Sequence, residues 1–229
     1  MTQETTLMDS AQYDRVFFFD IDNCLYPPNS GIMHLMKERI YAFGRESGLD
    51  EASVVDTCET YLRDYGLSVR GLIMHHKIDP TEFNAKVDGS IPLEDFIKPD
   101  AELRTMLKAI KTRRWAFTNA GKDHAYRVLK CLAVDDLFEG VTYCDYTEPD
   151  FPCKPERMAY NRAMSDAGVS DVKKCYFADD STKNVEAALQ LGWTAVWVWP
   201  SVDDTRIDKA IPQIKSIHQL PEVLPQLFK

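Results

Sequence analysis

Four polar segments of the sequence each follow a short apolar run and carry residue types that can do chemistry together. They are Asp20-Ile21-Asp22, Thr118-Asn119, Cys153-Lys154-Pro155 and Asp179-Asp180-Ser181. Neighbouring carboxylates repel unless a proton or a cation lies between them, and carboxylate oxygens are suitable ligands for Mg²⁺. A hydroxyl, a backbone N–H and an ammonium group can bind phosphate oxygens. In combination, the segments predict a site for a divalent cation and a phosphate group.

Each segment also has a purely structural interpretation. Asp-x-Asp is common in turns, Thr118-Asn119 could cap a helix over 122–133, and paired acids often cap helices. A lysine beside a proline is usually a solvated loop residue. The residue types alone therefore leave both interpretations open. The strands and helices around the segments indicate whether the segments lie close together.

The apolar runs that precede or surround these segments have the character of strands buried on both faces. They cover residues 16–19, 115–117, 141–144, 175–178 and 194–199. Helical periodicity is found between them, including one helix capped by Asp100 and another with Pro155 in its first turn. Strands that alternate with helices predict a doubly wound α/β fold with a mainly parallel sheet. In such sheets, ligands bind at the carboxyl ends of the strands, where the polar segments fall.

The interval between the first two strands is too long for an ordinary connection. Residues 25–99 contain no buried-strand run and show helical stripes instead, such as Ile32, Leu35, Met36, Ile40 and Phe43. We therefore predict a helical insertion over 25–99 that covers the carboxyl edge of a core formed by 1–24 and 100–229.

Composition limits the classes of function. The formal net charge is −9, with 27 basic and 36 acidic residues, which argues against a nucleic-acid partner. The sequence has no apolar stretch long enough to span a membrane, and residues 1–10 lack the basic region of a signal peptide. The six cysteines and five histidines show no zinc spacing. We expect reduced thiols and a cytoplasmic protein, with the nucleus as an alternative.

The order of the four segments resembles the signature motifs of the haloacid dehalogenase-like (HAD) phosphohydrolases, over about residues 13–227. The resemblance implies a HAD-like, Rossmannoid core with a cap of the C1 type. It also implies Mg²⁺-dependent hydrolysis of a small phosphate monoester. Dehalogenases of this superfamily lack the second aspartate because a halide leaves without a proton, so Asp22 favours phosphate chemistry.

The resemblance assigns a role to each matching residue. Asp20 would be the nucleophile that forms an aspartyl phosphate, and Asp22 would be the general acid and base. Mg²⁺ would be held by Asp20, the backbone carbonyl of Asp22 and Asp180, with Asp179 completing or orienting the site. Thr118 and the backbone N–H of Asn119 would bind phosphate, and Lys154 would offset negative charge. Asn184 stands where many relatives have another acid, which predicts weaker or altered Mg²⁺ binding.

Longer stretches narrow the resemblance to the pyrimidine 5′-nucleotidase branch. They include FFDIDNCLYPPNSGIMHLM, LFEGVTYCDY and the segment from Tyr65 to Asp100. The branch implies a nucleoside 5′-monophosphate as substrate, with UMP and CMP preferred, and a place in pyrimidine nucleotide metabolism. Tyr65 and Arg70 are candidates for contacting the base. Lysophosphatidic acid or a phosphosugar is an alternative substrate, and a non-catalytic regulatory protein is an alternative function.

Overall fold

The central element is a six-stranded sheet in the order β3-β2-β1-β4-β5-β6, in which each pair of neighbours is parallel. The computed structural model describes residues 14–199 and 211–229. This sheet confirms the predicted fold class. The strands are β1 (Val16–Phe19), β2 (Arg113–Phe117), β3 (Gly140–Thr142), β4 (Cys175–Asp179), β5 (Thr194–Val198) and β6 (Gln213–Ile214). The sequence did not predict β6, because two residues are too short to form a recognisable apolar run.

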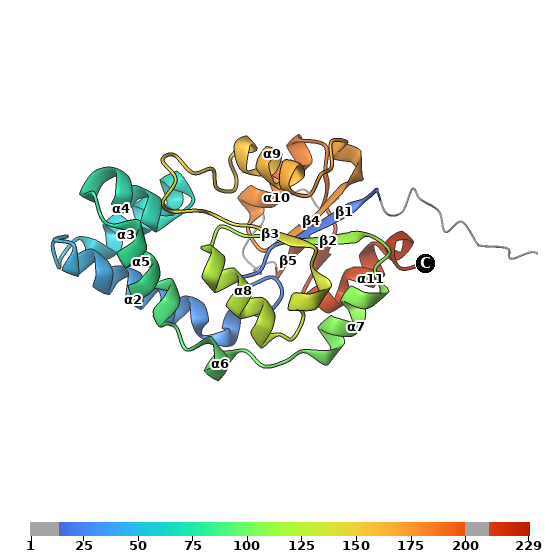
Figure 1. Ribbon diagram of the computed structural model, residues 1–229, viewed down its shortest axis with the longest axis horizontal. Helices are drawn as coiled ribbons and strands as arrows, with labels where there is room; N and C mark the ends of the chain where they lie inside the picture. The colour runs from blue at the N-terminus through green and yellow to red at the C-terminus, as the bar shows by residue number, and fades with distance from the viewer. Residues whose placement is uncertain (1–13, 200–210) are drawn as a thin grey trace, which may run out of the picture.

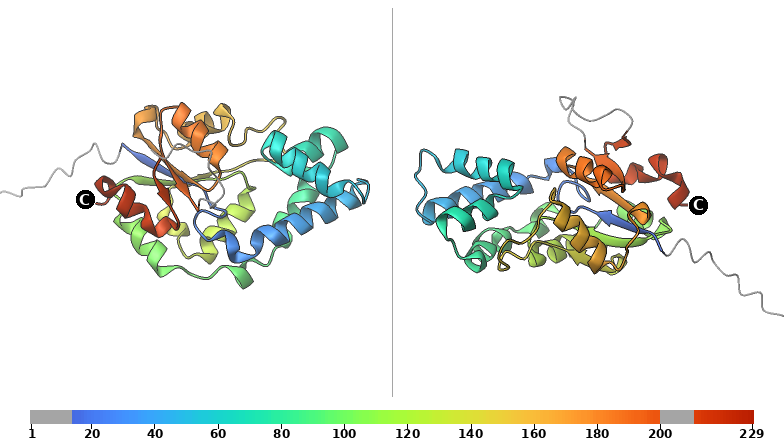
Figure 2. Two further views of the ribbon diagram at one scale, coloured as in Figure 1. Left: turned by 180° about the vertical axis from the view of Figure 1, so that it is seen from behind. Right: turned by 90° about the horizontal axis from the view of Figure 1, so that it is seen from above.

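Helices cover both faces of the sheet (Figures 1 and 2). On one face lie α9 (Arg157–Asp166) and α10 (Thr182–Gln190), which pack Tyr160 and Val185 against β1 and β4. On the other lie α7 (Ala101–Ala109), α8 (Lys122–Cys131) and α11 (Leu220–Val223). Short 3₁₀ turns complete the core at Asp135–Leu137, Val172–Lys174, Ile217–Gln219 and Pro225–Leu227. The alternation of strands with helices therefore buries the sheet on both sides, as its continuous apolar strands require.

Two local predictions about helix ends have different outcomes. The carboxylate of Asp100 accepts a hydrogen bond of 2.8 Å from the backbone N–H of Leu103, so Asp100 is the N-cap of α7 as predicted. The prediction that Pro155 lies in the first turn of a helix is wrong. Helix α9 begins at Arg157 and Glu156 is its N-cap residue, so Pro155 stays in the loop that carries Lys154.

A group of helices follows β1 and lies beyond the carboxyl end of the sheet (Figure 1). They are α2 (Ile32–Glu46), α3 (Val54–Tyr65), α4 (Ser68–His76), α5 (Pro80–Lys86) and α6 (Leu93–Phe96), with 3₁₀ turns at Pro28–Ser30 and Asp88–Ser90. Phe43, Val54, Leu72 and Phe83 form a separate apolar cluster here. Both ends of the segment, represented by Ile32 and Leu93, pack into the core of the sheet. The boundaries of the insertion at 25 and 99 remain a prediction.

The register of the sheet brings the polar segments together. Phe19 pairs with Ala116 on one side and with Ala178 on the other. The residues that come next in the three strands, Asp20, Phe117 and Asp179, therefore lie next to one another at the carboxyl edge. A shift of one residue in the pairing of β1 with β4 would separate the carboxylates of Asp20 and Asp179.

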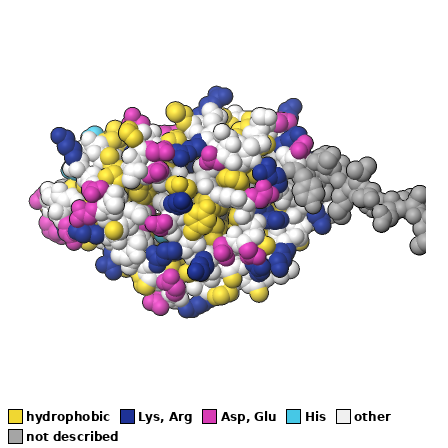
Figure 3. Space-filling model, viewed as in Figure 1, with side chains coloured by type: hydrophobic (Ala, Val, Ile, Leu, Met, Phe, Trp, Pro, Cys, Tyr) yellow, Lys and Arg dark blue, Asp and Glu magenta, His cyan; other side chains and the backbone are white. Residues whose placement is uncertain are grey.

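Basic and acidic side chains are interspersed on the face shown in Figure 3. Ion pairs of the described residues include Arg104 with Asp136 and Arg113 with Glu139. Within residues 14–199 and 211–229, no helix has the length and apolarity that crossing a bilayer would require. The signal-peptide prediction concerns residues 1–10, which lie outside the described residues.

Candidate active site

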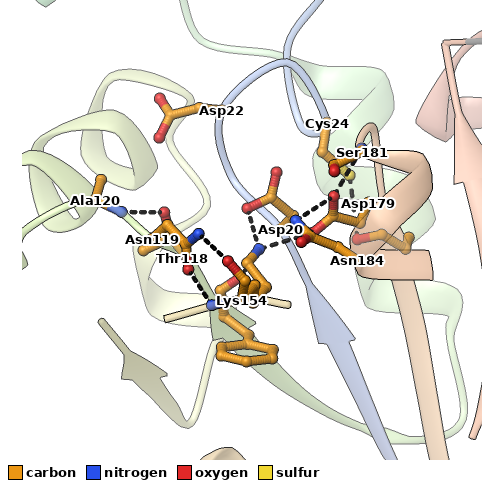
Figure 4. Close-up of polar contacts among 12 residues, drawn as sticks. Asp20, Asp22, Cys24, Thr118, Asn119, Ala120, Lys154, Asp179, Ser181 and Asn184 are labelled. Atoms are coloured by element: carbon orange, nitrogen blue, oxygen red, sulfur yellow. Dashed lines mark hydrogen bonds and ion pairs between the residues drawn. The ribbon is translucent and has the colours of Figure 1, made fainter. Parts of the chain in front are cut away.

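Lys154 is the centre of a buried polar cluster at the carboxyl edge of the sheet (Figure 4). Its ammonium group donates three hydrogen bonds of 2.7 Å, to the carboxylates of Asp20 and Asp179 and to the carbonyl of Phe117. Lys154 is 1 % exposed and Asp179 is 0 % exposed. An ammonium group has three protons, so the site satisfies this buried charge completely. The structure therefore brings Asp20, Lys154 and Asp179 together, as the order of motifs predicted.

Asp179 is held by protein donors on both of its carboxylate oxygens. The backbone N–H of Ser181 donates to Oδ1 at 2.8 Å, and the amide of Asn184 donates to Oδ1 and Oδ2 at 3.0 and 3.1 Å. Asn184 therefore orients Asp179 directly. An acid at position 184 could not donate these bonds while ionised, so the asparagine fits the carboxylate it faces.

Asp180 completes a cluster of three acids whose carboxylate oxygens, on Asp20, Asp179 and Asp180, lie within 4.8 Å of one another. Burial and the charge of Asp179 raise the pKa of Asp180 to about 7. Burial also raises the pKa of Asp20 well above its usual value, against the opposing effect of Lys154. Three carboxylates face a single ammonium group, and a divalent cation would balance the remaining charge. The donor set and its charge therefore fit Mg²⁺.

Thr118 and Asn119 end β2 beside this cluster. The hydroxyl oxygen of Thr118, which is 2 % exposed, accepts a hydrogen bond of 3.0 Å from the backbone N–H of Ala120, and the hydroxyl proton remains available. The side chain of Asn119 clamps the backbone of Lys154. Its Nδ2 donates to the Lys154 carbonyl at 2.9 Å, and its Oδ1 accepts from the Lys154 N–H at 2.7 Å. The sequence predicted a role only for the backbone of Asn119, and this side-chain clamp was not predicted.

Asp22 has different partners from Asp20, although both residues line the same cavity. Oδ1 of Asp22 accepts a hydrogen bond of 2.6 Å from the hydroxyl of Tyr26 and one of 2.8 Å from Nε2 of His124. Figure 4 shows Asp22 apart from the Lys154 cluster. Burial opposes ionisation of Asp22, but the charge and hydrogen bonds of His124 and the Tyr26 bond outweigh it, and the pKa of Asp22 is lowered.

Tyr26 and His124 are two further residues that the sequence reasoning missed. Tyr26 is 4 % exposed and His124 is 1 % exposed. His124 lies on the buried face of α8, and the sequence pattern there does not distinguish a histidine with a functional role from one that only packs in the core. Its proximity to Asp22 comes from packing between segments about a hundred residues apart.

A cavity of about 680 Å³ lies between the cluster and the helical insertion. Its lining includes Asp20, Asp22, Thr118, Lys154 and Asp180. This volume is in the range of pockets that hold a small molecule, roughly 300–1,000 Å³.

The two insertion residues predicted to contact the base lie in different surroundings. Tyr65 lines the cavity, and its hydroxyl forms a hydrogen bond of 2.8 Å with Nε2 of His75. Arg70 does not belong to the lining. Its guanidinium group binds the carboxylate of Glu156 and lies 3.4 Å from Sγ of Cys153. Arg70 therefore joins the insertion to the loop that carries Lys154.

Gly66 lies at the closest approach between the insertion and that loop. It has a φ of +78°, and a Cβ at this position would be 2.8 Å from the carbonyl oxygen of Lys154. Both the positive φ and the lack of space require glycine here. This contact brings the turn between α3 and α4 against the backbone of Lys154.

Residues 15–192 match the family of haloacid dehalogenase-like hydrolases. The chain belongs to this family. The match contains all four polar segments and the helical insertion, so the HAD-like organisation predicted from the order of the motifs is confirmed. The fold of this HAD-like chain and the convergence of Asp20, Lys154 and Asp179 agree with that membership.

Two kinds of relative are similar to this HAD-like chain. Phosphate metabolism protein 8 of Saccharomyces cerevisiae is 40% identical over 198 residues, which are 81% of this chain and 62% of that protein. The chain thus spans less than two thirds of this relative's length. A HAD phosphatase from Thermococcus onnurineus has a TM-score of 0.60 at 17% identity, covering 94% of this chain and 100% of that one. The magnesium-bound HAD-hydrolase YfnB from Bacillus subtilis has a TM-score of 0.56 at 14% identity, covering 93% and 98%. At these identities, the two solved structures show a shared fold.

Proposed function

We propose that this HAD-like hydrolase is a Mg²⁺-dependent phosphatase of small phosphate monoesters. The observation that carries the proposal is that Asp20, Asp22, Lys154 and Asp180 line one cavity, with Lys154 bonded to Asp20. A phosphate monoester hydrolyses very slowly without a catalyst, and covalent catalysis divides the reaction into two easier displacements. The site contains a nucleophile, an acid–base residue and groups that offset phosphate charge.

The chemistry follows from these side chains. A carboxylate oxygen of Asp20 attacks phosphorus, the bond to the leaving oxygen breaks, and Asp22 gives that oxygen a proton. Asp22 then removes a proton from the water that attacks the aspartyl phosphate, which releases phosphate and restores the Asp20 carboxylate. The Lys154 ammonium group, the Thr118 hydroxyl and the Asn119 backbone N–H bind and neutralise the phosphoryl oxygens.

Mg²⁺ is part of the proposal because the acidic cluster fits it. Asp20, Asp180 and the backbone carbonyl of Asp22 would hold the ion, while Asp179 stays bound to Asn184 and Lys154. When bound, Mg²⁺ supplies positive charge that stabilises the transferring phosphoryl group. The magnesium-bound relative with the same fold supports this choice of ion.

Removal of the ion is expected to abolish turnover. Excess EDTA should stop hydrolysis of p-nitrophenyl phosphate, and added Mg²⁺ should restore it, because the transition state would otherwise face uncompensated carboxylates. Steady-state assays before and after chelation measure this effect. Full activity in EDTA would contradict the role assigned to Asp180.

Mg²⁺ affinity is expected to depend on pH. The pKa of Asp180 is about 7 in the metal-free protein, so binding below that pH must displace a proton. Mg²⁺ should therefore bind about tenfold more weakly at about pH 6 than at about pH 8. The free energy of unfolding rises with the Mg²⁺ concentration c as RT ln(1 + c/Kd), so a series of Mg²⁺ concentrations gives the affinity without an activity assay.

The control for this measurement is Asp56→Asn, which changes an exposed acid of α3 and should leave both affinities unchanged. Asp180→Asn should weaken binding at both pH values. Equal affinity of the wild-type protein at the two pH values would show that no protonated carboxylate is displaced.

We further propose that the substrate is a nucleoside 5′-monophosphate, with a preference for pyrimidines. The sequence resemblance to the pyrimidine 5′-nucleotidase branch supports this, because it includes residues of the insertion. Tyr65 supports it as well, since it lines the cavity and carries an aromatic ring of the kind that stacks on a base. A lipid phosphate is a second candidate, favoured by the apolar side chains of Met33, Met36 and Ile40 in the same lining.

A comparison of kcat/KM values separates these substrates. We expect the kcat/KM values for UMP and CMP to exceed those for AMP, lysophosphatidic acid and a sugar phosphate under the same conditions. Tyr65→Leu should lower the value for UMP and leave that for the sugar phosphate nearly unchanged, because only the nucleotide loses a stacking partner. A tenfold advantage for the lipid, equivalent to about 1.4 kcal/mol in transition-state binding, would overturn the nucleotide assignment.

A further inference from the structure

We propose that His124 is a positioning residue that acts with Tyr26 to hold Asp22 in the orientation for proton transfer to the leaving group. This inference rests on the proposed phosphatase function. The observation behind it is that both residues bind the same carboxylate oxygen of Asp22, at 2.8 Å from His124 and 2.6 Å from Tyr26.

The geometry assigns different tasks to the two oxygens of Asp22. Oδ1 accepts both hydrogen bonds, whereas within the described part of the chain no hydrogen bond ends on Oδ2. Asp22 lines the cavity, and its side chain is 19% exposed. Two bonds to one oxygen fix the rotation of the carboxylate, and Oδ2 remains the atom that can carry the proton. An acid–base group oriented by a further residue is a recurring arrangement in hydrolases.

His124 is itself held firmly in place. Its side chain is 0% exposed, and its position on α8 is fixed by packing on the sheet. Gly121, the residue that precedes α8, packs against Asn84 and Asp88 of the insertion, and Asp88 accepts a hydrogen bond of 3.3 Å from Tyr146. Arg127 on the same helix donates to the carbonyl of Ile91 at 2.7 Å. These contacts tie α8 to the insertion, so the histidine is presented to Asp22 by a rigid support.

The dependence of the reaction on the leaving group tests this role. Unsubstituted phenolate needs a proton as it leaves, whereas p-nitrophenolate leaves readily without one. Phenyl phosphate and p-nitrophenyl phosphate otherwise have the same ring and the same phosphate. A residue that positions the general acid should therefore matter much more for phenyl phosphate, and a residue with only a structural role should affect both esters equally.

We expect His124→Leu to lower kcat/KM at least about tenfold more for phenyl phosphate than for p-nitrophenyl phosphate. His124→Gln, which can still donate a hydrogen bond, should recover part of the loss. Tyr26→Phe should show the same selectivity to a smaller extent. Because this substitution removes only one oxygen atom, it still tests the proposal if His124→Leu fails to fold. His218→Gln is the matched control. Nε2 of His218 forms a similar bond of 3.0 Å with the carboxylate of Asp100, and neither residue lines the cavity.

A double-variant cycle tests whether His124 acts through Asp22. In an Asp22→Asn background, His124→Leu should cause little further loss for phenyl phosphate. Equal losses on both esters, or a full further loss in that background, would overturn the positioning role while leaving the phosphatase proposal intact. Absence of any Asp20-dependent turnover in the wild-type protein would overturn the proposed function, and this inference with it.

Discussion

Asp20→Asn is expected to lower kcat/KM for p-nitrophenyl phosphate by at least about 10³-fold. The amide has nearly the shape of the carboxylate, but it is a poor nucleophile and cannot form the aspartyl phosphate. It also removes one of the two carboxylates bound to Lys154 at 2.7 Å. Steady-state kinetics with excess Mg²⁺ measures the loss, and mass spectrometry of rapidly quenched protein detects the phosphorylated intermediate in the wild type alone.

This substitution also decides between an enzyme and a regulatory protein that keeps only the fold. Asp56→Asn, at an exposed position of α3, is the matched control and should retain full activity. Wild-type turnover that survives unchanged in Asp20→Asn would come from a contaminating phosphatase or another nucleophile. Either origin would mean that the measured turnover does not depend on Asp20.

Lys154→Met is expected to cause the largest loss of stability at any single position of the site. It would leave Asp20 and Asp179 buried without their ammonium partner, and breaking a buried ion pair typically costs about 3–5 kcal/mol. Urea unfolding in metal-free buffer measures the free energy of unfolding. Phosphatase activity should also be lost, because the substrate would lose the positive charge that balances Asp20 and the phosphoryl group.

The stability loss should be greater at about pH 8 than at about pH 5. Burial and the neighbouring acids raise the pKa of Asp20 in the folded protein, and removing Lys154 raises it further. The folded variant then binds more protons than the unfolded chain. Its stability is therefore greatest at low pH and falls as the pH rises through the folded-state pKa.

Lys174→Met is the matched control for this experiment. Lys174 pairs with Asp14 at 3.0 Å, but both side chains are exposed, and the expected change is within about 0.5 kcal/mol. A loss for Lys154→Met no larger than that of the control, or one that grows as the pH falls, would contradict the charge-balancing role of Lys154.

The sequence predicted the sheet because its strands are buried on both faces. Runs such as Val16–Phe19 and Cys175–Asp179 contain almost only apolar residues, and this pattern requires a parallel sheet covered by helices. The short strand Gln213–Ile214 carries too little pattern to be found, and the position of Pro155 before α9 depends on the loop geometry around Lys154.

The sequence also predicted that Asp20, Thr118, Lys154 and Asp180 meet, because each follows a strand whose carboxyl end had to reach one edge of the sheet. It did not predict the partners of these residues. The Asn119 clamp on Lys154, the bonds from Asn184 to Asp179 and the contact of Arg70 with Glu156 all depend on the conformations of loops and side chains.

The sequence by itself determined which residue types meet at the carboxyl edge, since strand order and apolar periodicity are local properties that survive in a linear pattern. Only the tertiary structure decided how the two motif aspartates differ. Asp20 is bound by Lys154 and Asp22 by Tyr26 and His124, although only Ile21 separates them in the sequence. That difference arises from packing between distant segments, because a buried carboxylate takes the state that its surrounding donors stabilise.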